Sequence, residues 1–315
     1  MIEFAGADGT RLAATLTSPS GLADFPAVVA VHAASGGTRA APLLEHLASF
    51  LPALGVATFI YDRRGEGASA GSLGARMAVL AADARAAVSV TAEQPGVRPH
   101  CIGLWGHSQG GWIAPMAAAG NDMVTFLIAV AASGVTPHDQ MIYATANLMR
   151  EAGYAEKQIA RATGLRNRLH ELARGTGSVT EVRQLIREAS TEPWYPLTYL
   201  PDPASGNEES ALQDEVAFEW DLDVTPALAQ LRIPVLLFHG ENDRWVPIEE
   251  SIQAWRAALD QQGARLTLKR LPCCGHFPTL PVDPADRDEA GPISPAYEQL
   301  LGDWLRPICM TGGPR

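Results

Sequence analysis

The feature that most constrains the fold is the segment 101–111, where a short apolar run leads into the motif Gly-x-Ser-x-Gly. Ser108 stands at the centre of the motif, between Gly106 and Gly110, and small apolar residues follow. This order predicts a strand, a sharp turn and a helix, and such a turn lifts a serine hydroxyl clear of the backbone. The glycines allow strand and helix to pack closely. We therefore predict that Ser108 is a nucleophile. The alternative is a chance match in a chain with 29 glycines.

Buried strands and helices alternate on both sides of this turn. Continuous apolar runs are typical of strands that are covered on both faces, as in a parallel sheet. Strands are expected at 2–5, 11–17, 25–32, 56–61, 100–105, 124–130, 234–239 and 266–271. Helices are expected at 40–53, 77–91, from 109, 248–262 and 295–305. The pattern predicts an α/β fold with a mostly parallel central sheet flanked by helices.

The alternation stops between residues 135 and 231, where helical patterns occur but no buried strand. We predict a core domain formed by 1–134 and 232–315, with an inserted, mainly helical cap at 135–231. A solvated side lobe is the alternative. A group of Trp and Tyr residues around Trp194 favours a cap, because large aromatic rings near a cleft usually line it.

Charge and apolar patterning exclude several classes of function. The chain has 24 basic and 35 acidic residues, a net charge of −11. This balance argues against a nucleic-acid surface or an anionic-membrane surface. The longest apolar stretches, 27–34 and 124–132, are shorter than the ~20 residues that a membrane helix needs. The beginning of the chain has no secretory pattern, so we expect a cytoplasmic location.

The four cysteines, Cys101, Cys273, Cys274 and Cys309, match no zinc-binding pattern. We expect free thiols, as in a reducing compartment, and no metal or other cofactor. The adjacent pair at 273 and 274 leaves a vicinal disulfide or redox control as an alternative.

A serine nucleophile needs a general base, and the base needs a carboxylate that orients it. Reactive groups in open α/β sheets gather at the carboxyl ends of the strands. Asp243 follows the strand 234–239, and Glu241 is a rival for the acid. Of the eight histidines, only His276 lies in a late loop beyond that acid. We predict Asp243 and His276 as the partners of Ser108.

The negatively charged oxygen that forms during acyl transfer needs two N–H donors. The backbone N–H of Gln109, directly after the nucleophile, is the first candidate. The second comes from the small-residue loop at 32–37, where we predict Ala34, with Ala33 as the alternative donor. A plain glycine turn is the competing interpretation of that loop. Ala33, Trp112 and Trp194 are candidate substrate contacts, although core packing explains the two tryptophans equally well.

The dense cluster at 61–69 lacks the signature of a nucleotide loop. We interpret it as a structural loop beside the 32–37 turn. It contains the pattern Asp-x-Arg-Gly-x-Gly-x-Ser at 62–69. Three further motifs are the serine turn, the His276 loop and Gly-x-x-Asp-x-x-Val-Pro at 240–247. Together these motifs resemble the α/β-hydrolase superfamily over nearly all of residues 1–310. Within it, the chain looks like bacterial serine carboxylesterases related to the prolyl-oligopeptidase and dienelactone-hydrolase groups.

The resemblance implies that Ser108 is the nucleophile, His276 the base and Asp243 the orienting acid. The chain departs from the pattern in two places. The 32–37 loop begins His-Ala where such esterases often have His-Gly, and Ser108 stands where dienelactone hydrolases typically use cysteine. No β-propeller domain is expected, which argues against a size-filtered oligopeptidase.

We therefore expect a cofactor-independent serine hydrolase that cleaves small-molecule carboxylic esters, bulky esters or lactones among them, through an acyl-enzyme. An aminopeptidase or amidase on the same fold is the first alternative. A non-catalytic binding protein is the second. The oligomeric state does not follow from the sequence.

Overall fold

The computed structural model describes residues 1–261, 263–283 and 286–311, with side chains for all of these except 283, 286–290 and 309–311. The chain forms two compact units. Unit 1 comprises Met1–Gly134, Val224–Asp243 and Ile248–Arg315, and unit 2 comprises Val135–Asp223 and Arg244–Pro247. Residues 224–231, which the sequence assigned to the insertion, therefore lie in unit 1. Their apolar side chains Val224, Leu228 and Leu231 are buried.

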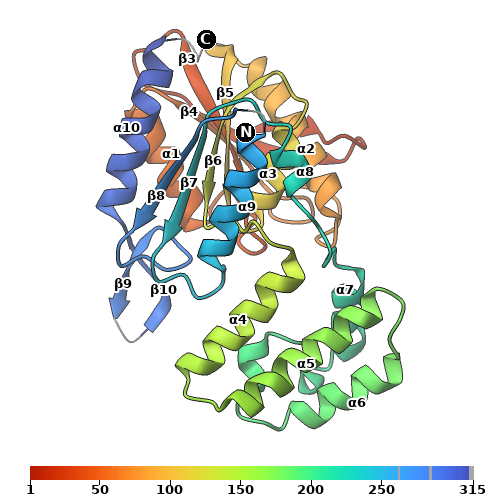
Figure 1. Ribbon diagram of the computed structural model, residues 1–315. Coiled ribbons are helices and arrows are strands. Elements are labelled where there is room, and N and C mark those ends of the chain that lie inside the picture. Colours follow the sequence, from red (N-terminus) through yellow and green to blue (C-terminus); the bar gives the residue numbers. More distant parts are fainter. Residues whose placement is uncertain (262, 284–285, 312–315) are drawn as a thin grey trace. The chain divides into compact units, whose positions relative to one another are not determined.

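Unit 1 is built on an eight-stranded sheet with the order β1-β2-β4-β3-β5-β6-β7-β8 (Figure 1). The strands are β1 (Ile2–Ala5), β2 (Arg11–Thr17), β3 (Phe25–Val31), β4 (Ala57–Tyr61), β5 (Val97–His107), β6 (Val124–Val130), β7 (Val235–Gly240) and β8 (Leu266–Leu271). β2 pairs antiparallel with β1 and β4, and every later pair is parallel. The predicted mostly parallel sheet is confirmed.

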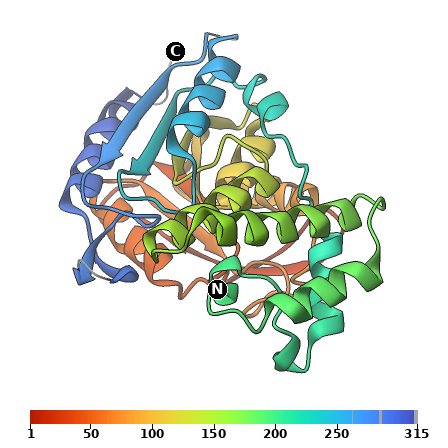
Figure 2. The same cartoon turned by 60° about the horizontal axis from the view of Figure 1, so that its bottom comes forward.

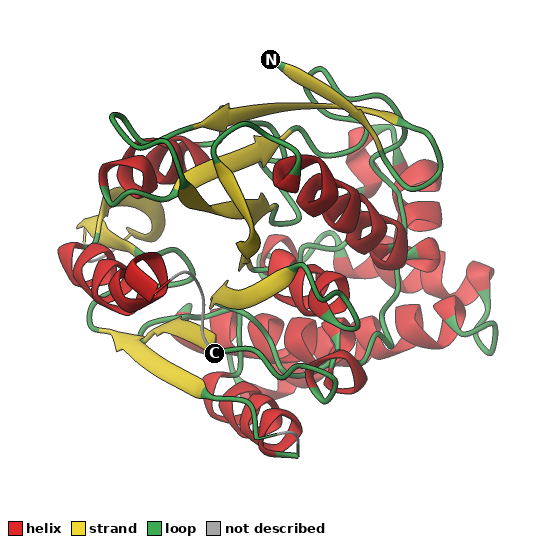
Figure 3. Ribbon diagram, turned by 90° about the horizontal axis from the view of Figure 1, so that it is seen from above, coloured by secondary structure: helices red, strands yellow, loops and turns green. Residues whose placement is uncertain are grey.

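The central strands are covered on both faces, which explains their continuous apolar sequences. Every residue of β3, β4 and β7 is buried. The covering helices are α1 (Pro42–Ala53), α2 (Met77–Ala92), α3 (Gly110–Ala118), α8 (Thr225–Leu228), α9 (Ile248–Asp260) and α10 (Pro295–Thr311). α1 and α10 lie on one face and the other four on the opposite face (Figure 1), and Figure 3 shows helices on both sides of the sheet. The apolar sides of α1 and α10 share one core cluster with alternate residues of the sheet.

Unit 2 is helical, with α4 (Pro137–Glu151), α5 (Glu156–Ala173), α6 (Val179–Ala189) and α7 (Glu208–Ala217) (Figure 2). Two short 3₁₀ turns, η1 (Tyr195–Thr198) and η2 (Pro203–Ser205), connect α6 to α7. The helices have a core of their own, in which Trp194 is completely buried. Thr136 caps α4 by accepting a hydrogen bond from the Asp139 N–H at 3.1 Å.

Several elements were not expected from the sequence. β9 (Thr279–Asp283) and β10 (Asp286–Ile293) form a separate antiparallel pair, and α7 and α8 had no clear periodic pattern. α10 continues six residues beyond its expected end at 305, through Pro307 to Thr311. No helix within the described ranges is long and apolar enough to cross a membrane.

Candidate active site

Ser108 lies in a sharp turn between the end of β5 and the start of α3. Its backbone φ of 53° is in the left-handed region that non-glycine residues rarely adopt. A bond of 3.0 Å from its N–H to the Val130 carbonyl of neighbouring β6 holds this conformation. The strained turn presents the serine hydroxyl at the carboxyl end of the sheet, as the Gly-x-Ser-x-Gly motif predicts.

The two motif glycines are required by close backbone contacts. A Cβ at Gly106 would lie 2.3 Å from the Gly110 carbonyl oxygen. A Cβ at Gly110 would lie 2.6 Å from the Val31 carbonyl oxygen at the end of β3. The first turn of α3 therefore packs directly against β3, at the point where the 32–37 loop begins.

His276 and Asp243 reach Ser108 from the loops that follow β8 and β7. The distance from His276 Nε2 to Ser108 Oγ is 2.8 Å, and that from His276 Nδ1 to Asp243 Oδ2 is 2.9 Å. The two loops touch closely, because a Cβ at Gly240 would lie only 2.1 Å from the Gly275 carbonyl oxygen. Glu241, the rival acid, is exposed.

The surroundings of these three side chains suit proton transfer. The Asp243 side chain has no exposed surface, whereas 14% of the His276 side chain is exposed. The buried carboxylate accepts the Nδ1–H and fixes the imidazole tautomer in which Nε2 is free to accept the serine proton. Ser108, His276 and Asp243 thus form a continuous chain of hydrogen bonds.

His107 links the serine turn to the His276 loop. Its Nε2 donates to the backbone carbonyl of His276 at 2.9 Å, and the two rings lie 5.2 Å apart. Burial lowers the pKa of His107 to about 3, so the ring is neutral and its partner carbonyl requires the Nε2–H tautomer. The contact anchors the backbone that carries His276.

Two backbone N–H groups near Ser108 have no acceptor within the described part of the chain. They belong to Gln109, which directly follows the serine, and to Ala34 in the loop after β3. Ala34 is exposed, while Ala33 is half-buried. Two unengaged donors at the meeting point of β3 and α3 suit a negatively charged oxygen.

The loop at 62–69 is a network of buried charge behind this site. Arg64 donates to both Asp83 oxygens, at 2.8 and 2.6 Å, and also to both oxygens of Asp8. The Arg64 and Asp83 side chains are 6% and 1% exposed. Asp62 accepts from Arg39 and from the Ala68 N–H. This network supports the structural interpretation of the loop.

His32 and His239 are buried and neutral like His107: burial lowers the pKa of each of these two side chains to about 4. Both ring nitrogens of His239 lack hydrogen-bond partners among the described residues. The charged or titratable groups around the His239 ring are Asp243, His276, Arg270 and Glu249.

We expect stability to fall between pH 7 and pH 5. The unfolded chain binds protons at these histidines near pH 6.5, while the folded chain does not until the pH is near their lowered values. The contribution of these neutral histidines to the free energy of unfolding is therefore complete above about pH 7, and it is lost as the pH falls toward 4. Each buried histidine removes about 2 kcal/mol of unfolding free energy by pH 5. His239→Leu should flatten this dependence by about that amount in urea unfolding at both pH values.

The matched control is His100→Leu, at an exposed strand position. An equal flattening in this control, or none in His239→Leu, would contradict the role assigned to burial.

The structure separates the other predicted site residues. Trp112 is almost completely buried in the first turn of α3, and its place in a substrate site remains a prediction. Trp194 is a core residue of unit 2, where the Arg161 guanidinium lies 5.6 Å from the ring centroid. It has no exposed surface there, and its role as a substrate contact stays a prediction. Sequence reasoning did not single out His107, because its partner is a backbone carbonyl in a loop far along the chain.

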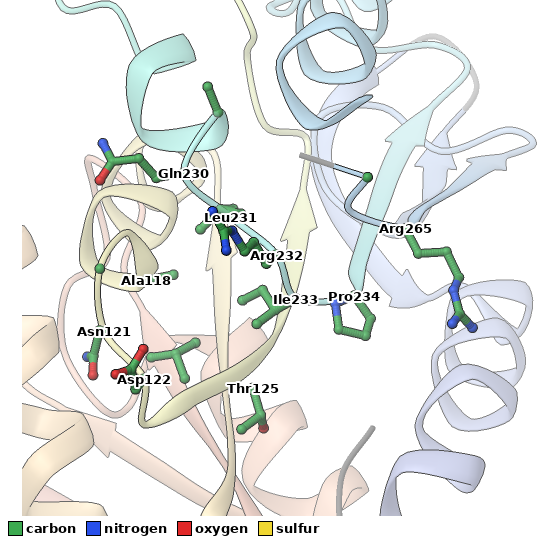
Figure 4. A pocket seen from close by; sticks show the side chains of 14 residues that line it. Ala118, Asn121, Asp122, Thr125, Gln230, Leu231, Arg232, Ile233, Pro234 and Arg265 are labelled. Atoms are coloured by element: carbon green, nitrogen blue, oxygen red, sulfur yellow. The ribbon is translucent and has the colours of Figure 1, made fainter. Parts of the chain in front are cut away.

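A groove of about 660 Å³ lies at the amino ends of β6 and β7 (Figure 4). Ser108 is at the other end of the strands, where their carboxyl ends lie. Asn121, Asp122, Arg232 and Arg265 are among the residues that line it. It contains no serine, cysteine or histidine, so we do not assign the reaction to it.

Metal ligation and disulfides find no support in the described residues. No group of three or more His, Cys, Asp or Glu side chains is placed to hold a metal ion there. Cys101, Cys273 and Cys274 are free thiols, and the Cys309 side chain lies outside the described residues.

Comparison with known proteins agrees with this architecture. A family model described as serine aminopeptidase, S33, matches residues 26–278. The structure is similar to that of DcsB in complex with its substrate analogue, with TM-score 0.63, 19% identity and 98% of each chain covered. It is also similar to Est1E from Butyrivibrio proteoclasticus with bound ferulic acid, with TM-score 0.57, 20% identity and coverage of 98% of this chain and 97% of that one.

A proline iminopeptidase from Mycobacterium smegmatis has TM-score 0.61 and 15% identity, with 98% of each chain covered. No curated protein matches the chain at the level of sequence. At these identities, the similar structures establish the α/β-hydrolase fold.

Proposed function

The chain belongs to the serine aminopeptidase S33 family of α/β hydrolases, and we propose that it cleaves carboxylic esters with Ser108 as the nucleophile. The observation that carries this proposal is the chain of hydrogen bonds from Ser108 Oγ through His276 to Asp243, at 2.8 and 2.9 Å. The strained backbone at Ser108 supports it, because such strain is retained at sites where it serves the chemistry.

In the proposed reaction, His276 Nε2 takes the proton from Ser108 Oγ as the oxygen attacks the ester carbonyl. Asp243 stabilises the imidazolium that forms. His276 then gives the proton to the departing alcohol, and an acyl group remains on Ser108. Water, activated by the same imidazole, attacks the acyl-enzyme and releases the carboxylic acid.

The N–H groups of Ala34 and Gln109 are the proposed donors to the oxyanion of each tetrahedral intermediate. Both are free to donate among the described residues, and the loss of one such donor typically costs about a hundredfold or more in kcat. Ala33 remains the alternative to Ala34.

An aminopeptidase is the second candidate, because the family description names one. Recognition of a free substrate amine needs an available carboxylate, and unit 2 contains several acidic residues that could supply one. Glu208 and Glu209 are instead ion-paired with Arg187 and Arg183. Burial raises the pKa of Glu215 to about 7, which leaves much of it uncharged at neutral pH. Glu208, Glu209 and Glu215 are therefore unsuited to binding a free amine. We propose carboxylic esters as the substrates, bulky esters and lactones among them.

The test compares p-nitrophenyl esters of short and long acyl chains with aminoacyl p-nitroanilides. We expect kcat/KM for the best ester to exceed that for the best anilide by about a hundredfold or more. Faster cleavage of an anilide would instead support the aminopeptidase. Labelling with a fluorophosphonate and mass spectrometry should place the adduct on Ser108, and a folded but unlabelled protein would favour a non-catalytic binding role.

A further inference from the structure

Arg63, the residue after Asp62 in the loop behind the site, is buried in an unusual setting. Its side chain donates from Nη1 to the carbonyl oxygens of Ala33 and Ala34, each at 3.1 Å. The residue is 8% exposed. One guanidinium therefore holds two consecutive peptide groups of the loop that carries the proposed oxyanion donor.

The orientation of these carbonyls determines where the N–H groups point. The Ala33 carbonyl and the Ala34 N–H belong to one peptide group, and in a trans peptide they point in opposite directions. No cis peptide occurs in the described part of the chain. Because Arg63 draws the carbonyl toward itself, it turns the Ala34 N–H away from itself. The Ala34 carbonyl and the Ser35 N–H are related in the same way.

The far end of the loop is also held against Arg63. The backbone N–H of Arg63 donates to the Gly37 carbonyl at 2.6 Å, and the backbone N–H of Gly37 donates to the Glu66 carboxylate at 3.0 Å. A Cβ at Gly37 would lie 2.7 Å from the Arg63 Cβ, so the loop wraps tightly around this residue. The guanidinium contacts are thus built on a fixed backbone.

Arg63 also differs from its neighbours in charge pairing. Arg39 and Arg64 have carboxylate partners, whereas Arg63 makes no ion pair with any residue that the structure describes. Glu66 acts on the Arg63 charge without forming an ion pair, so the cost of burying this guanidinium is only partly offset. Arg63, His32 and Ile113 of α3 line one small cavity, so Arg63 lies close to the helix that follows Ser108.

We propose that Arg63 is a positioning residue that aims the Ala34 N–H at the substrate oxyanion. The proposal rests on the function proposed above, because it needs an oxyanion at Ser108. The positive charge of Arg63 polarises the two peptide groups that it holds and thereby strengthens their N–H groups as donors.

The test measures Arg63→Gln and Arg63→Lys against the wild-type enzyme, with p-nitrophenyl butyrate and a trifluoromethyl ketone that forms an anionic adduct with Ser108. We expect Arg63→Gln to lower kcat about a hundredfold with KM changed by less than about threefold. The inhibition constant for the ketone should rise in parallel with the loss of kcat/KM. Arg63→Lys retains one charged donor and should lose less.

Arg85→Gln is the matched control, because Arg85 also holds two backbone carbonyls, those of Met116 and Ala119, but not those of Ala33 or Ala34. It should retain the wild-type kcat and ketone affinity. An Arg63→Gln enzyme with wild-type kcat and ketone affinity would overturn the proposal, as would a loss of activity without a loss of ketone affinity. If Arg63→Gln does not fold, Arg63→Lys decides by the same two readouts. Wild-type protein that cleaves no ester and forms no adduct at Ser108 would instead remove the proposed function.

Discussion

Replacing Ser108 with alanine is expected to reduce kcat for ester hydrolysis by about 10⁵-fold, to the residual level that binding and oxyanion donors alone provide. The alanine side chain has no oxygen to form the acyl-enzyme, and His276 then has no proton to accept. The change removes one atom from a turn held by backbone contacts, so the fold should survive. Steady-state kinetics measures the loss of kcat, and circular dichroism checks that the fold survives.

The control for Ser108→Ala is Ser89→Ala on α2. The Ser89 hydroxyl donates only to the Arg85 carbonyl one turn earlier, at 3.2 Å, so its loss should leave kcat unchanged. Fluorophosphonate should label wild-type protein and Ser89→Ala but not Ser108→Ala. Ester hydrolysis by Ser108→Ala at the wild-type rate would show that another group carries the reaction.

Replacing Asp83 with alanine is expected to lower the free energy of unfolding by about 3–5 kcal/mol. The change leaves the Arg64 guanidinium buried and without the partner that accepts two of its hydrogen bonds. Asp8 remains as a second partner, but its side chain is 54% exposed and cannot replace a buried bidentate contact. Urea unfolding followed by tryptophan fluorescence measures the change.

Asp24→Ala supplies the comparison for Asp83→Ala. Asp24 is also paired with an arginine, Arg98, at 2.7 Å, but its side chain is 69% exposed. Its loss should lower the free energy of unfolding by about 1 kcal/mol or less, because the Asp24 carboxylate is already hydrated in the folded protein and gains little from the pair. Equal losses in the two variants would refute the claim that burial makes the Arg64–Asp83 pair important.

Sequence patterns predicted the sheet well because burial on both faces leaves a direct signal. The apolar runs of β3, β6 and β7 could be recognised one by one, and their carboxyl ends indicated where to seek Asp243 and His276. The structure brings these two side chains within hydrogen-bond range of each other and of Ser108. Their catalytic roles remain predictions for the experiments above.

What the sequence did not indicate depends on contacts between distant backbone segments. Arg63 holds carbonyls 29 and 30 residues earlier in the chain, and His107 donates to a carbonyl 169 residues later. No periodic pattern in the sequence indicates contacts between residues that lie so far apart along the chain. Trp194 was ambiguous for a related reason, since an aromatic side chain looks the same in sequence whether it fills a core or lines a pocket.

Unit 2 is a composite of two chain segments, and this has a consequence for protein engineering. The short segment 244–247 is bound to the long one: Arg244 pairs with Glu151 at 3.0 Å, and the ring of Trp245 lies 4.6 Å from that of Tyr199. Excision of 135–223 alone would remove Glu151 from Arg244 and Tyr199 from Trp245. A design that transfers unit 2 to another protein should therefore carry residues 244–247 together with 135–223.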